Sequence, residues 1–252
     1  MERERHAGKT AIVTGAGNGI GRATVRQLAA EGAKVIGCDL NEQALTETSA
    51  MLDDRGLSAT LAVADITSQQ DVERLVADAG GSIDVLANVA GIMDHFVPLG
   101  ELDDDLWDRV LAVNLSGVMR LTRAVLPGMV ERASGAIVTV ASKASTSAGA
   151  SGAAYAASKH GVIGLVKSIA YFYGPQGIRS NAVLPGGVTT AIGATAAPRS
   201  EWAFQRAQLS MATMPPAADA DRIAEVVSWL ASDEASFVNG ATVAADGGWA
   251  TA

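Results

Sequence analysis

The sequence predicts an α/β fold, in which a doubly wound parallel sheet carries helices on both of its faces. Short apolar runs alternate with longer segments of helical periodicity along the chain, a pattern typical of βαβ units joined by right-handed crossovers. The 252 residues contain no repeat, low-complexity linker or break in composition. This length is common for one α/β domain, so we expect residues 1–252 to form a single domain.

Each element is justified by its own pattern. Runs that are apolar at successive positions suit strands buried on both faces. The expected strands are Lys9–Thr14, Lys34–Cys38, Ala59–Ala64, Ile83–Ala87, Ala136–Ala141, Ile178–Leu184 and Ala241–Ala244. Between them, helical periodicity predicts a helix from Ile20 that stops at Gly32, followed by Glu42–Leu52, Asp71–Ala79, one or two helices in Asp103–Glu131, Gly152–Tyr173 and Asp221–Leu230. Pro127 should disturb its helix near the end, and the acidic residues that open that region at Asp103 suit a helix start.

Composition narrows the classes of partner and compartment. The net charge is -8 and there is no basic block, so nucleic acid and anionic membranes are not expected partners. The single cysteine, Cys38, excludes an internal disulfide and fits a reducing compartment. The charged amino terminus is not followed by an apolar signal core, and no window has the length and composition of a membrane span. We therefore expect a soluble cytoplasmic protein with no metal site, since the three histidines show no metal-ligand pattern.

One stretch, Ser142–Lys159, carries acid–base chemistry. Tyr155 and Lys159 are four residues apart and share one helical face if Ser151 caps the helix. A neighbouring ammonium should lower the phenol pKa from its ordinary value near 10 towards neutrality. Ser142 follows a predicted strand and lies where open α/β sheets place their ligands. The three side chains can therefore converge on one carbonyl oxygen.

A glycine-rich turn follows the first predicted strand. Gly15, Gly19 and Gly21 have the spacing G-x-x-x-G-x-G, and Ile20 occupies the third glycine position of the stricter dinucleotide fingerprint. Such a turn presents backbone N–H groups and a helix start to a pyrophosphate. Asp39 ends the second strand, where a carboxylate accepts hydrogen bonds from a ribose diol and repels a 2'-phosphate. The alternative is a turn or helix-cap role for Asp39, with Asn41 an equal cap candidate.

Together these motifs resemble the compact form of the short-chain dehydrogenase/reductase family, and the resemblance covers essentially the whole chain. The residues that carry it are Thr14–Gly21, Asp65, Asn88–Gly91, Asn114, Ser142, the Tyr155-x-x-x-Lys159 pair and Pro185–Thr190. This sequence departs from the residues usual in the family at two positions, Val89 and Lys143. The Lys143 side chain is expected to point to solvent rather than to an anionic substrate. His95 lies in a loop that relatives use near the substrate, but a surface position is expected for it.

The resemblance implies a Rossmann-type domain and a role for each matching residue. Tyr155 would be the general acid/base, Lys159 would lower its pKa and bind ribose hydroxyls, Ser142 would bind the substrate oxygen, and Asn114 would position a relay water. The implied cofactor-binding residues are Gly15, Asn18, Gly19, Ile20, Gly21, Asp39, Leu40, Asp65, Ile66, Asn88, Ala90, Gly91, Tyr155, Lys159, Pro185, Gly186, Val188 and Thr190. The cofactor expected from Asp39 is NAD.

The expected activity is NAD-dependent interconversion of a secondary alcohol and a ketone. The alternatives are a 3-ketoacyl-type reductase that uses NADPH and a non-catalytic dinucleotide-binding regulator. Relatives pair the helix Gly152–Tyr173 across a two-fold axis, which implies a homotetramer, or a dimer. A substrate lid at about residues 190–216 is expected to be mobile without ligand and ordered by NADH. Trp202, Phe204 and Met211 would line an apolar substrate pocket or make ordinary contacts of a short lid helix, and the family's substrate cover at this place favours the pocket.

Overall fold

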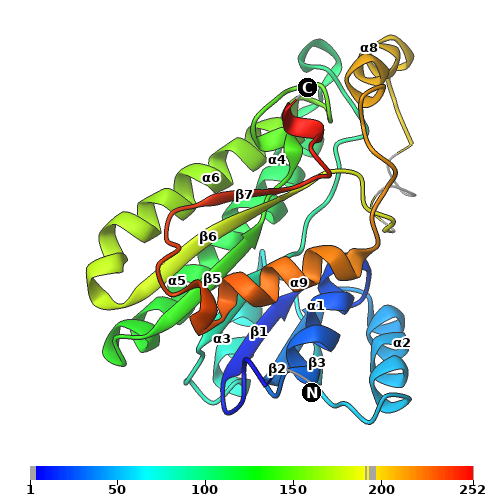
Figure 1. Ribbon diagram of the computed structural model, residues 1–252. Helices are drawn as coiled ribbons and strands as arrows, with labels where there is room; N and C mark the ends of the chain where they lie inside the picture. The colour runs from blue at the N-terminus through cyan, green and yellow to red at the C-terminus, as the bar shows by residue number, and fades with distance from the viewer. Residues whose placement is uncertain (1–3, 191, 193–196, 252) are drawn as a thin grey trace.

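The computed structural model describes residues 4–190, 192 and 197–251. These residues form a seven-stranded sheet with strand order β3-β2-β1-β4-β5-β6-β7 (Figure 1). Every neighbouring pair of strands in it is parallel. The strands are β1 (Thr10–Thr14), β2 (Lys34–Asp39), β3 (Thr60–Val63), β4 (Val85–Asn88), β5 (Gly135–Val140), β6 (Ile178–Pro185) and β7 (Thr242–Ala245). The predicted fold class is confirmed, and all seven predicted strands are present.

The predicted helices are present in the predicted order, and an additional helix at Glu201–Met211 forms in a segment whose weak periodicity predicted none. They are α1 (Gly19–Ala30), α2 (Glu42–Asp53), α3 (Gln69–Asp78), α4 (Asp104–Leu111), α5 (Val118–Glu131), α6 (Ala153–Tyr173), α8 (Glu201–Met211) and α9 (Ala220–Ala231). A π-helical turn, Ala112–Gly117, separates α4 from α5. Pro127 lies inside α5 without ending it. The Asp103 carboxylate caps α4 by accepting the Leu106 N–H at 2.7 Å, as the acidic start of that region predicted. None of the helices in the described part of the chain combines the length and apolar composition that a bilayer crossing requires.

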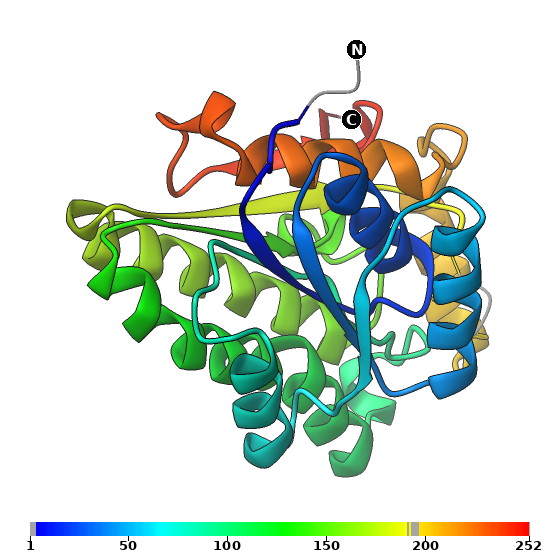
Figure 2. The same cartoon turned by 90° about the horizontal axis from the view of Figure 1, so that it is seen from below.

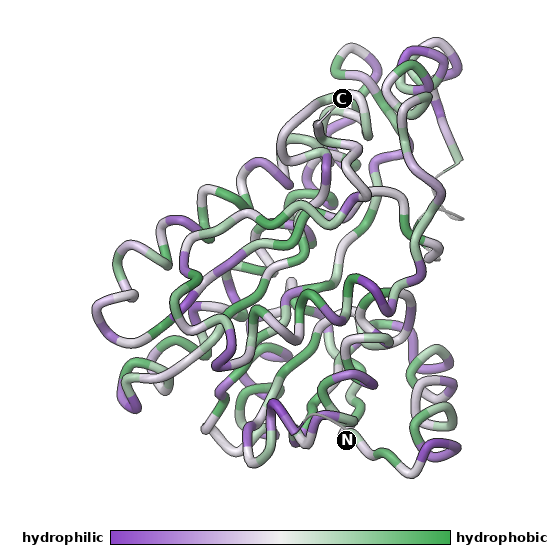
Figure 3. Tube along the Cα trace, in the orientation of Figure 1, coloured by the Kyte–Doolittle hydropathy of each residue, from purple (hydrophilic) through white to green (hydrophobic). Residues whose placement is uncertain are grey.

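Alternate residues of the central strands pack into separate hydrophobic clusters on the two faces of the sheet. In β1, Ala11 and Val13 pack with α1, α2 and α9, whereas Ile12 packs with α3 and α5 on the other face. Figure 2 shows α1 and α9 on one side of the sheet and α5 and α6 on the other. Because both faces of the sheet are covered, the strands are apolar at successive positions. In Figure 3, hydrophobic residues (green) are frequent along the central strands.

The strand order fixes where a ligand can bind. β1 and β4 are neighbours, and the chain proceeds outward from them in both directions, so their connections leave towards opposite faces. A crevice opens at such a switch point, beyond the carboxyl ends of the strands. The glycine-rich turn after β1 and the segment Val89–Gly91 after β4 border this crevice.

Candidate active site

A cleft of about 710 Å³ lies at the carboxyl ends of the strands. Segments that follow β1, β2, β4, β5 and β6 line it, together with residues of α4 and α6. Of the residues expected from the sequence, the cleft is lined by Gly15, Asn18, Gly19, Ile20, Gly21, Asp39, Ala90, Gly91, Ser142, Tyr155, Lys159, Pro185, Gly186, Val188 and Thr190. The fold thus brings together in one hollow motifs that are far apart in the chain.

The glycine-rich turn fits an anionic group. Gly15 and Gly19 have φ values of 71° and 48°, in the left-handed region that favours glycine. A Cβ on Gly21 would lie 1.9 Å from the Gly15 carbonyl oxygen, so this position has no space for a side chain. Asn18 precedes α1 without making a side-chain capping bond, and the first turn of α1 contains no acidic residue. The helix start therefore offers its N–H groups to the cleft, as binding of a pyrophosphate requires.

Asp39 is held at the end of β2 by two backbone donors. Its carboxylate accepts the Gly17 N–H and the Asn41 N–H, each at 3.0 Å. Asn41 is the residue that caps α2, since its side chain accepts the Ala44 N–H at 3.0 Å. The cap alternative for Asp39 is thereby removed. The carboxylate is oriented beside the glycine-rich turn, on the wall of the cleft.

Ser142, Tyr155 and Lys159 meet at the end of β5. Ser142 lies close enough to the Tyr155 hydroxyl to act on its pKa. Ser142 is itself fixed by a short helical turn, where its Oγ accepts the Ala144 N–H at 3.1 Å. The Lys159 ammonium donates to the Val140 carbonyl at 2.9 Å and lies 5.6 Å from the centre of the Tyr155 ring. Both Tyr155 and Lys159 are buried.

The pKa of Tyr155 moves in the direction opposite to the one expected. Burial raises it to about 12, the hydrogen bond from Ser142 acts to lower it, and the charge of Asp94 raises it. Burial also lowers the pKa of Lys159 to about 8. The removal of the phenol from water dominates its pKa here and outweighs the attraction between ammonium and phenolate on which the expectation rested. At neutral pH the phenol therefore carries its proton.

Asn114 lies in the π-helical turn between α4 and α5 and is fully buried. Its side-chain oxygen accepts the Ile92 N–H at 2.8 Å, and its amide donates to the Ile92 carbonyl at 3.0 Å and to Ser158 Oγ at 3.2 Å. It therefore ties the loop after β4 to α6. A Cβ on Gly91 would touch both Asn114 Oδ1 and Lys159 Nζ, at 3.3 and 3.5 Å, which places the amide beside the ammonium.

The start of α6 differs from the expected arrangement. Gly152, not Ser151, is the N-cap residue, and Ser151 Oγ donates to the Gly152 carbonyl. The capping acceptor comes from a distant loop: the Asp94 carboxylate accepts the Gly152 N–H at 2.9 Å and the Tyr155 N–H at 2.8 Å. Asp94 lies 58 residues before Gly152 in the sequence, so no local pattern indicates it.

Residues after β6 close the other side of the cleft. A Cβ on Gly19 would come within 2.8 Å of the Thr190 methyl group, so this segment packs on the glycine-rich turn. The expected lid includes residues 191 and 193–196, which lie outside the described residues. Trp202 is exposed and donates to Glu101. Phe204 and Met211 pack against Phe96 instead of lining the cleft, so their expected role in a substrate pocket is not what the structure shows.

Lys143 departs from expectation, whereas His95 keeps a partly exposed position at the cleft. Lys143 is buried, with its ammonium 4.6 Å from the centre of the Trp249 ring and 3.4 Å from Ser210 Oγ, so the expected solvent position is wrong. His95 is half-buried and lines the cleft, with Nδ1 hydrogen-bonded to the Ala197 carbonyl at 3.0 Å. Packing against segments remote in sequence decides both positions.

Several expected cofactor residues do not line the cleft. The Asn88 amide points into the protein, towards Thr122 and Thr139. The Asp65 carboxylate accepts the Thr67 N–H and hydroxyl. The remaining two are Leu40, which is exposed, and Ile66, which is buried against Gly117. Val89 lines the cleft, as expected for the segment Asn88–Gly91. Ten further residues that were not expected from the sequence also line it: Asn41, Ile92, Met93, His95, Leu106, Arg109, Val140, Ala141, Ile192 and Arg199. They come from the segments after β2, β4 and β6, from the end of β5 and from α4, and no single sequence pattern marks them.

Comparisons with known proteins agree with this geometry. A family profile described as enoyl-(acyl carrier protein) reductase matches residues 15–250. The 3beta-hydroxysteroid dehydrogenase 2 of Eggerthella lenta is 38% identical over 257 residues, which cover 99% of each chain. Levodione reductase superposes with a TM-score of 0.90 at 34% identity, covering 98% of this chain and 100% of that one. A protein described as an NAD(P)-dependent gluconate 5-dehydrogenase of Beutenbergia cavernae, solved with bound NADP, has a TM-score of 0.88 at 37% identity and covers 99% of both chains.

Proposed function

The chain belongs to the short-chain dehydrogenase/reductase family, and we propose that it uses NAD, with Tyr155 as general acid and base. The activity is that of an NAD(P)-dependent oxidoreductase that interconverts a secondary alcohol and a ketone. The observation that carries the proposal is the convergence of Ser142, Tyr155 and Lys159 in the cleft that also holds the glycine-rich turn.

The proton chemistry follows from the state of the phenol. With its pKa near 12, Tyr155 carries its proton at neutral pH and can donate it to a carbonyl oxygen. The Ser142 hydroxyl lies beside the phenol and lines the same cleft, where it can hold the same oxygen. The Lys159 ammonium, with its pKa near 8, remains mostly charged at neutral pH and favours the phenolate that forms on proton transfer. The nicotinamide cofactor, when bound, exchanges a hydride with the carbon atom of the substrate.

The choice of NAD rests on Asp39. Its carboxylate is oriented by Gly17 and Asn41 at the end of β2, where it can accept a ribose diol and would repel a 2'-phosphate. The gluconate 5-dehydrogenase neighbour holds NADP, so the preference has to come from residues of this chain. Arg22, the nearest described cation to the turn, is committed to the Gly17 carbonyl at 2.5 Å and to Glu47 at 2.9 Å.

We also propose that residues 1–252 form one dinucleotide-binding and catalytic domain, and that residues 190–216 cover the substrate. The described part of that cover is anchored: Phe204 stacks edge-on against Phe96, with ring centres 5.1 Å apart. Tyr171 and Phe172 are exposed on α6, which supports a symmetric homotetramer, or a dimer, formed through this helix. The buried Cys38 suits the cytoplasm.

A reductase of acyl-carrier substrates is the second candidate, because the matching family profile carries that kind of description. Such an enzyme of the 3-ketoacyl type is expected to use NADPH, and Asp39 weighs against it. The two candidates are separated most directly by substrate, since only the second predicts turnover of a 3-ketoacyl thioester.

The test is a screen of secondary alcohols and ketones with NAD(H) and with NADP(H), read by the absorbance of the reduced cofactor. We expect turnover of at least one alcohol and a higher kcat/KM with NAD. Faster turnover with NADPH on a 3-ketoacyl thioester would favour the second candidate. The screen also ranks steroid, cyclic ketone and polyol substrates, which the names of the relatives do not decide.

A further inference from the structure

The loop after β4 contains a tight turn of unusual geometry. His95 and Phe96 have φ values of 55° and 56°, in the left-handed region that side chains with a Cβ rarely adopt. The Val97 N–H donates to the Asp94 carbonyl at 3.1 Å and closes the turn. Two successive non-glycine residues persist in this conformation only where surrounding contacts hold them. The contacts on the two sides of the turn lead to two different parts of the active site.

On one side, the turn holds the first turn of the catalytic helix. Asp94 is fully buried, and its carboxylate oxygens accept the Gly152 and Tyr155 N–H groups at 2.9 and 2.8 Å. The Ala153 N–H donates to the Val97 carbonyl at 3.0 Å. A Cβ on Gly152 would lie 2.5 Å from backbone atoms of Val97 and 2.6 Å from Asp94 Oδ2, so loop and helix are in direct contact. The backbone of Tyr155 itself is therefore positioned from outside its own helix.

On the other side, the turn holds the described part of the substrate cover. The Arg199 N–H donates to the His95 carbonyl at 3.0 Å, and the His95 ring is hydrogen-bonded to the Ala197 carbonyl at the same distance. The Phe96 ring packs edge-on against Phe204 of α8. Consecutive residues of one turn thus contact the catalytic helix and the cover.

We propose that Asp94 is a positioning residue for the reaction, and that the turn Asp94–Val97 couples the placement of Tyr155 to the seating of the cover over the substrate. This inference rests on the proposed role of Tyr155. The Asp94 carboxylate holds the backbone N–H of Tyr155. It thereby fixes the direction in which the Tyr155 side chain carries its hydroxyl towards Ser142. The hydrogen bonds from the His95 ring to the Ala197 carbonyl and from the Arg199 N–H to the His95 carbonyl link that direction to the cover.

The charge of Asp94 gives the role a measurable signature. The charged groups around the phenol are Lys159, one helical turn along α6, and Asp94, while His95, Arg109 and Arg199 line the wider cleft. The carboxylate opposes ionisation of the phenol and so contributes to its raised pKa. Neutralising it should move the pH dependence of alcohol oxidation, which needs the phenolate, to lower pH.

Asp94→Asn is the first test, since the amide is nearly isosteric and keeps one acceptor. We expect kcat to fall by at least ~10-fold, the pH profile of alcohol oxidation to shift to lower pH, and the Kd of NADH to stay within about 2-fold of the native value. Ser68→Ala is the matched control, because Ser68 caps α3 far from the cleft through the Asp71 N–H. It should lower the melting temperature and leave kcat and the pH profile unchanged.

Gly152→Ala approaches the same contact from the helix side and keeps the charge of Asp94. Here kcat should fall without a shift of the pH profile, so the variant also tests the proposal if Asp94→Asn does not fold. Native kcat and a native pH profile in a folded Asp94→Asn protein would overturn the proposal. So would a fall in kcat accompanied by an equal loss of NADH affinity, which would make Asp94 purely structural. Tyr155→Phe distinguishes failure of the proposed function from failure of the proposed role of Asp94. If the Tyr155→Phe protein keeps turnover, the proposed function fails, whatever the Asp94 variants do.

Discussion

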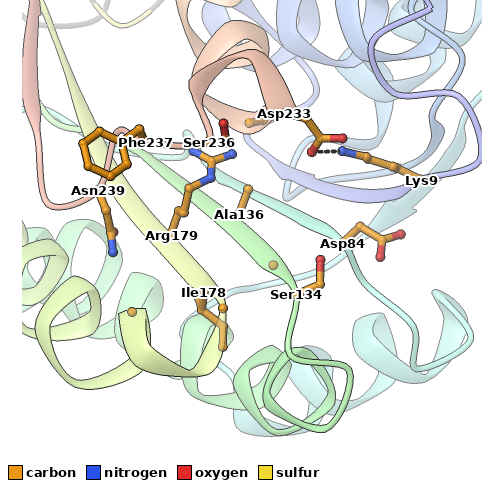
Figure 4. Close-up of a pocket in the computed structure, with 14 residues that line it drawn as sticks. Lys9, Asp84, Ser134, Ala136, Ile178, Arg179, Asp233, Ser236, Phe237 and Asn239 are labelled. Carbon is orange, nitrogen blue, oxygen red and sulfur yellow. Dashed lines mark hydrogen bonds and ion pairs between the residues drawn. The ribbon is translucent and has the colours of Figure 1, made fainter.

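The two ends of the central sheet carry hollows of comparable size and very different chemistry. The cleft at the carboxyl ends measures about 710 Å³ and the cavity at the amino ends about 480 Å³. Figure 4 shows the second cavity, in which the Lys9 ammonium points at the Asp233 carboxylate, 2.7 Å away. Arg179, at its centre, donates to the carbonyls of Leu230 and Ser232 at 2.7 and 2.9 Å. The charges of this cavity are thus engaged with the protein itself.

The direction of the helices explains the difference. Helices in a parallel α/β sheet begin near the carboxyl ends of the strands and end near the amino ends. The cleft therefore receives the N–H groups of helix starts, and the opposite cavity receives the carbonyls of helix ends. Among these are the two at the end of α9 that Arg179 binds, Leu230 in its last turn and the C-cap residue Ser232. The cations at the amino ends of the strands bind groups of the protein and stabilise the fold. Asp39, Tyr155 and Lys159, at the carboxyl ends, face the cleft. Volume alone would not distinguish the two hollows.

The largest expected effect tests the carboxyl edge. Tyr155→Phe removes only the hydroxyl, and we expect turnover to fall by at least ~10²-fold while NADH binding survives. Single-turnover absorbance and NADH fluorescence titration measure the two quantities. Lys159→Ala should lower both, since its ammonium lies beside the phenol and the cleft. Near-native turnover of the Tyr155→Phe protein would show that the chemistry of this cleft is different.

The matching test at the amino ends of the strands is Arg179→Met. This substitution keeps much of the side-chain volume and removes the guanidinium N–H donors. We expect the free energy of unfolding to fall by roughly 2 kcal/mol, because buried carbonyls lose hydrogen bonds to a charged group. Urea denaturation measures this change, and kcat per folded enzyme should stay native. Lys9→Met is the control, since the exposed ion pair with Asp233 should contribute less than about 1 kcal/mol. A loss of kcat in the Arg179 variant would mean that the two ends of the sheet are not independent.

The sequence predicted the sheet because strands covered on both faces are apolar at successive positions, a signal that survives without tertiary information. It also predicted which motifs meet, since the carboxyl ends of parallel strands must share one edge. Ser142, Tyr155 and Asp39 line the cleft for that reason. Their individual roles in the reaction remain predictions.

What the sequence could not supply are effects that depend on distant packing. The Asp94 cap joins residues about sixty positions apart. Lys143 is buried only because Trp249 and α8 cover it. The pKa of Tyr155 is raised by burial, which periodicity does not quantify. Asn88 and Asp65 follow strands as the cofactor residues do, yet their side chains bond to the protein interior and to their own turn.

A smaller effect should follow a change in the cofactor-binding part of the cleft. Asp39→Ala should lower kcat/KM for NAD, because the ribose diol loses its hydrogen-bond acceptor. It should also narrow the ratio of kcat/KM with NAD to kcat/KM with NADP by about 10-fold, because the 2'-phosphate of NADP is no longer repelled. Steady-state kinetics with both cofactors gives the ratio. Asp39→Asn is the control that removes the charge and keeps an acceptor, so it should narrow the ratio mainly through NADP. A native preference for NADP would refute the assignment of Asp39.

The smallest expected effect comes from a buried titratable group outside both hollows. His6 is fully buried, with Nε2 3.1 Å from Ser228 Oγ and 3.5 Å from the Glu31 carboxylate. Burial lowers its pKa below the ordinary 6.5, and the nearby Glu31 only partly opposes this. The unfolded chain therefore binds more protons as the pH falls below 6.5, so stability is lost in that direction, by at most about 1.4 kcal/mol per pH unit. Urea denaturation at about pH 7.5 and about pH 5.5 should show a smaller loss for His6→Gln than for the native protein. An equal loss of unfolding free energy in the native and His6→Gln proteins would show that other groups cause the acid sensitivity. We expect kcat of His6→Gln to be unchanged, because His6 lies outside the cleft.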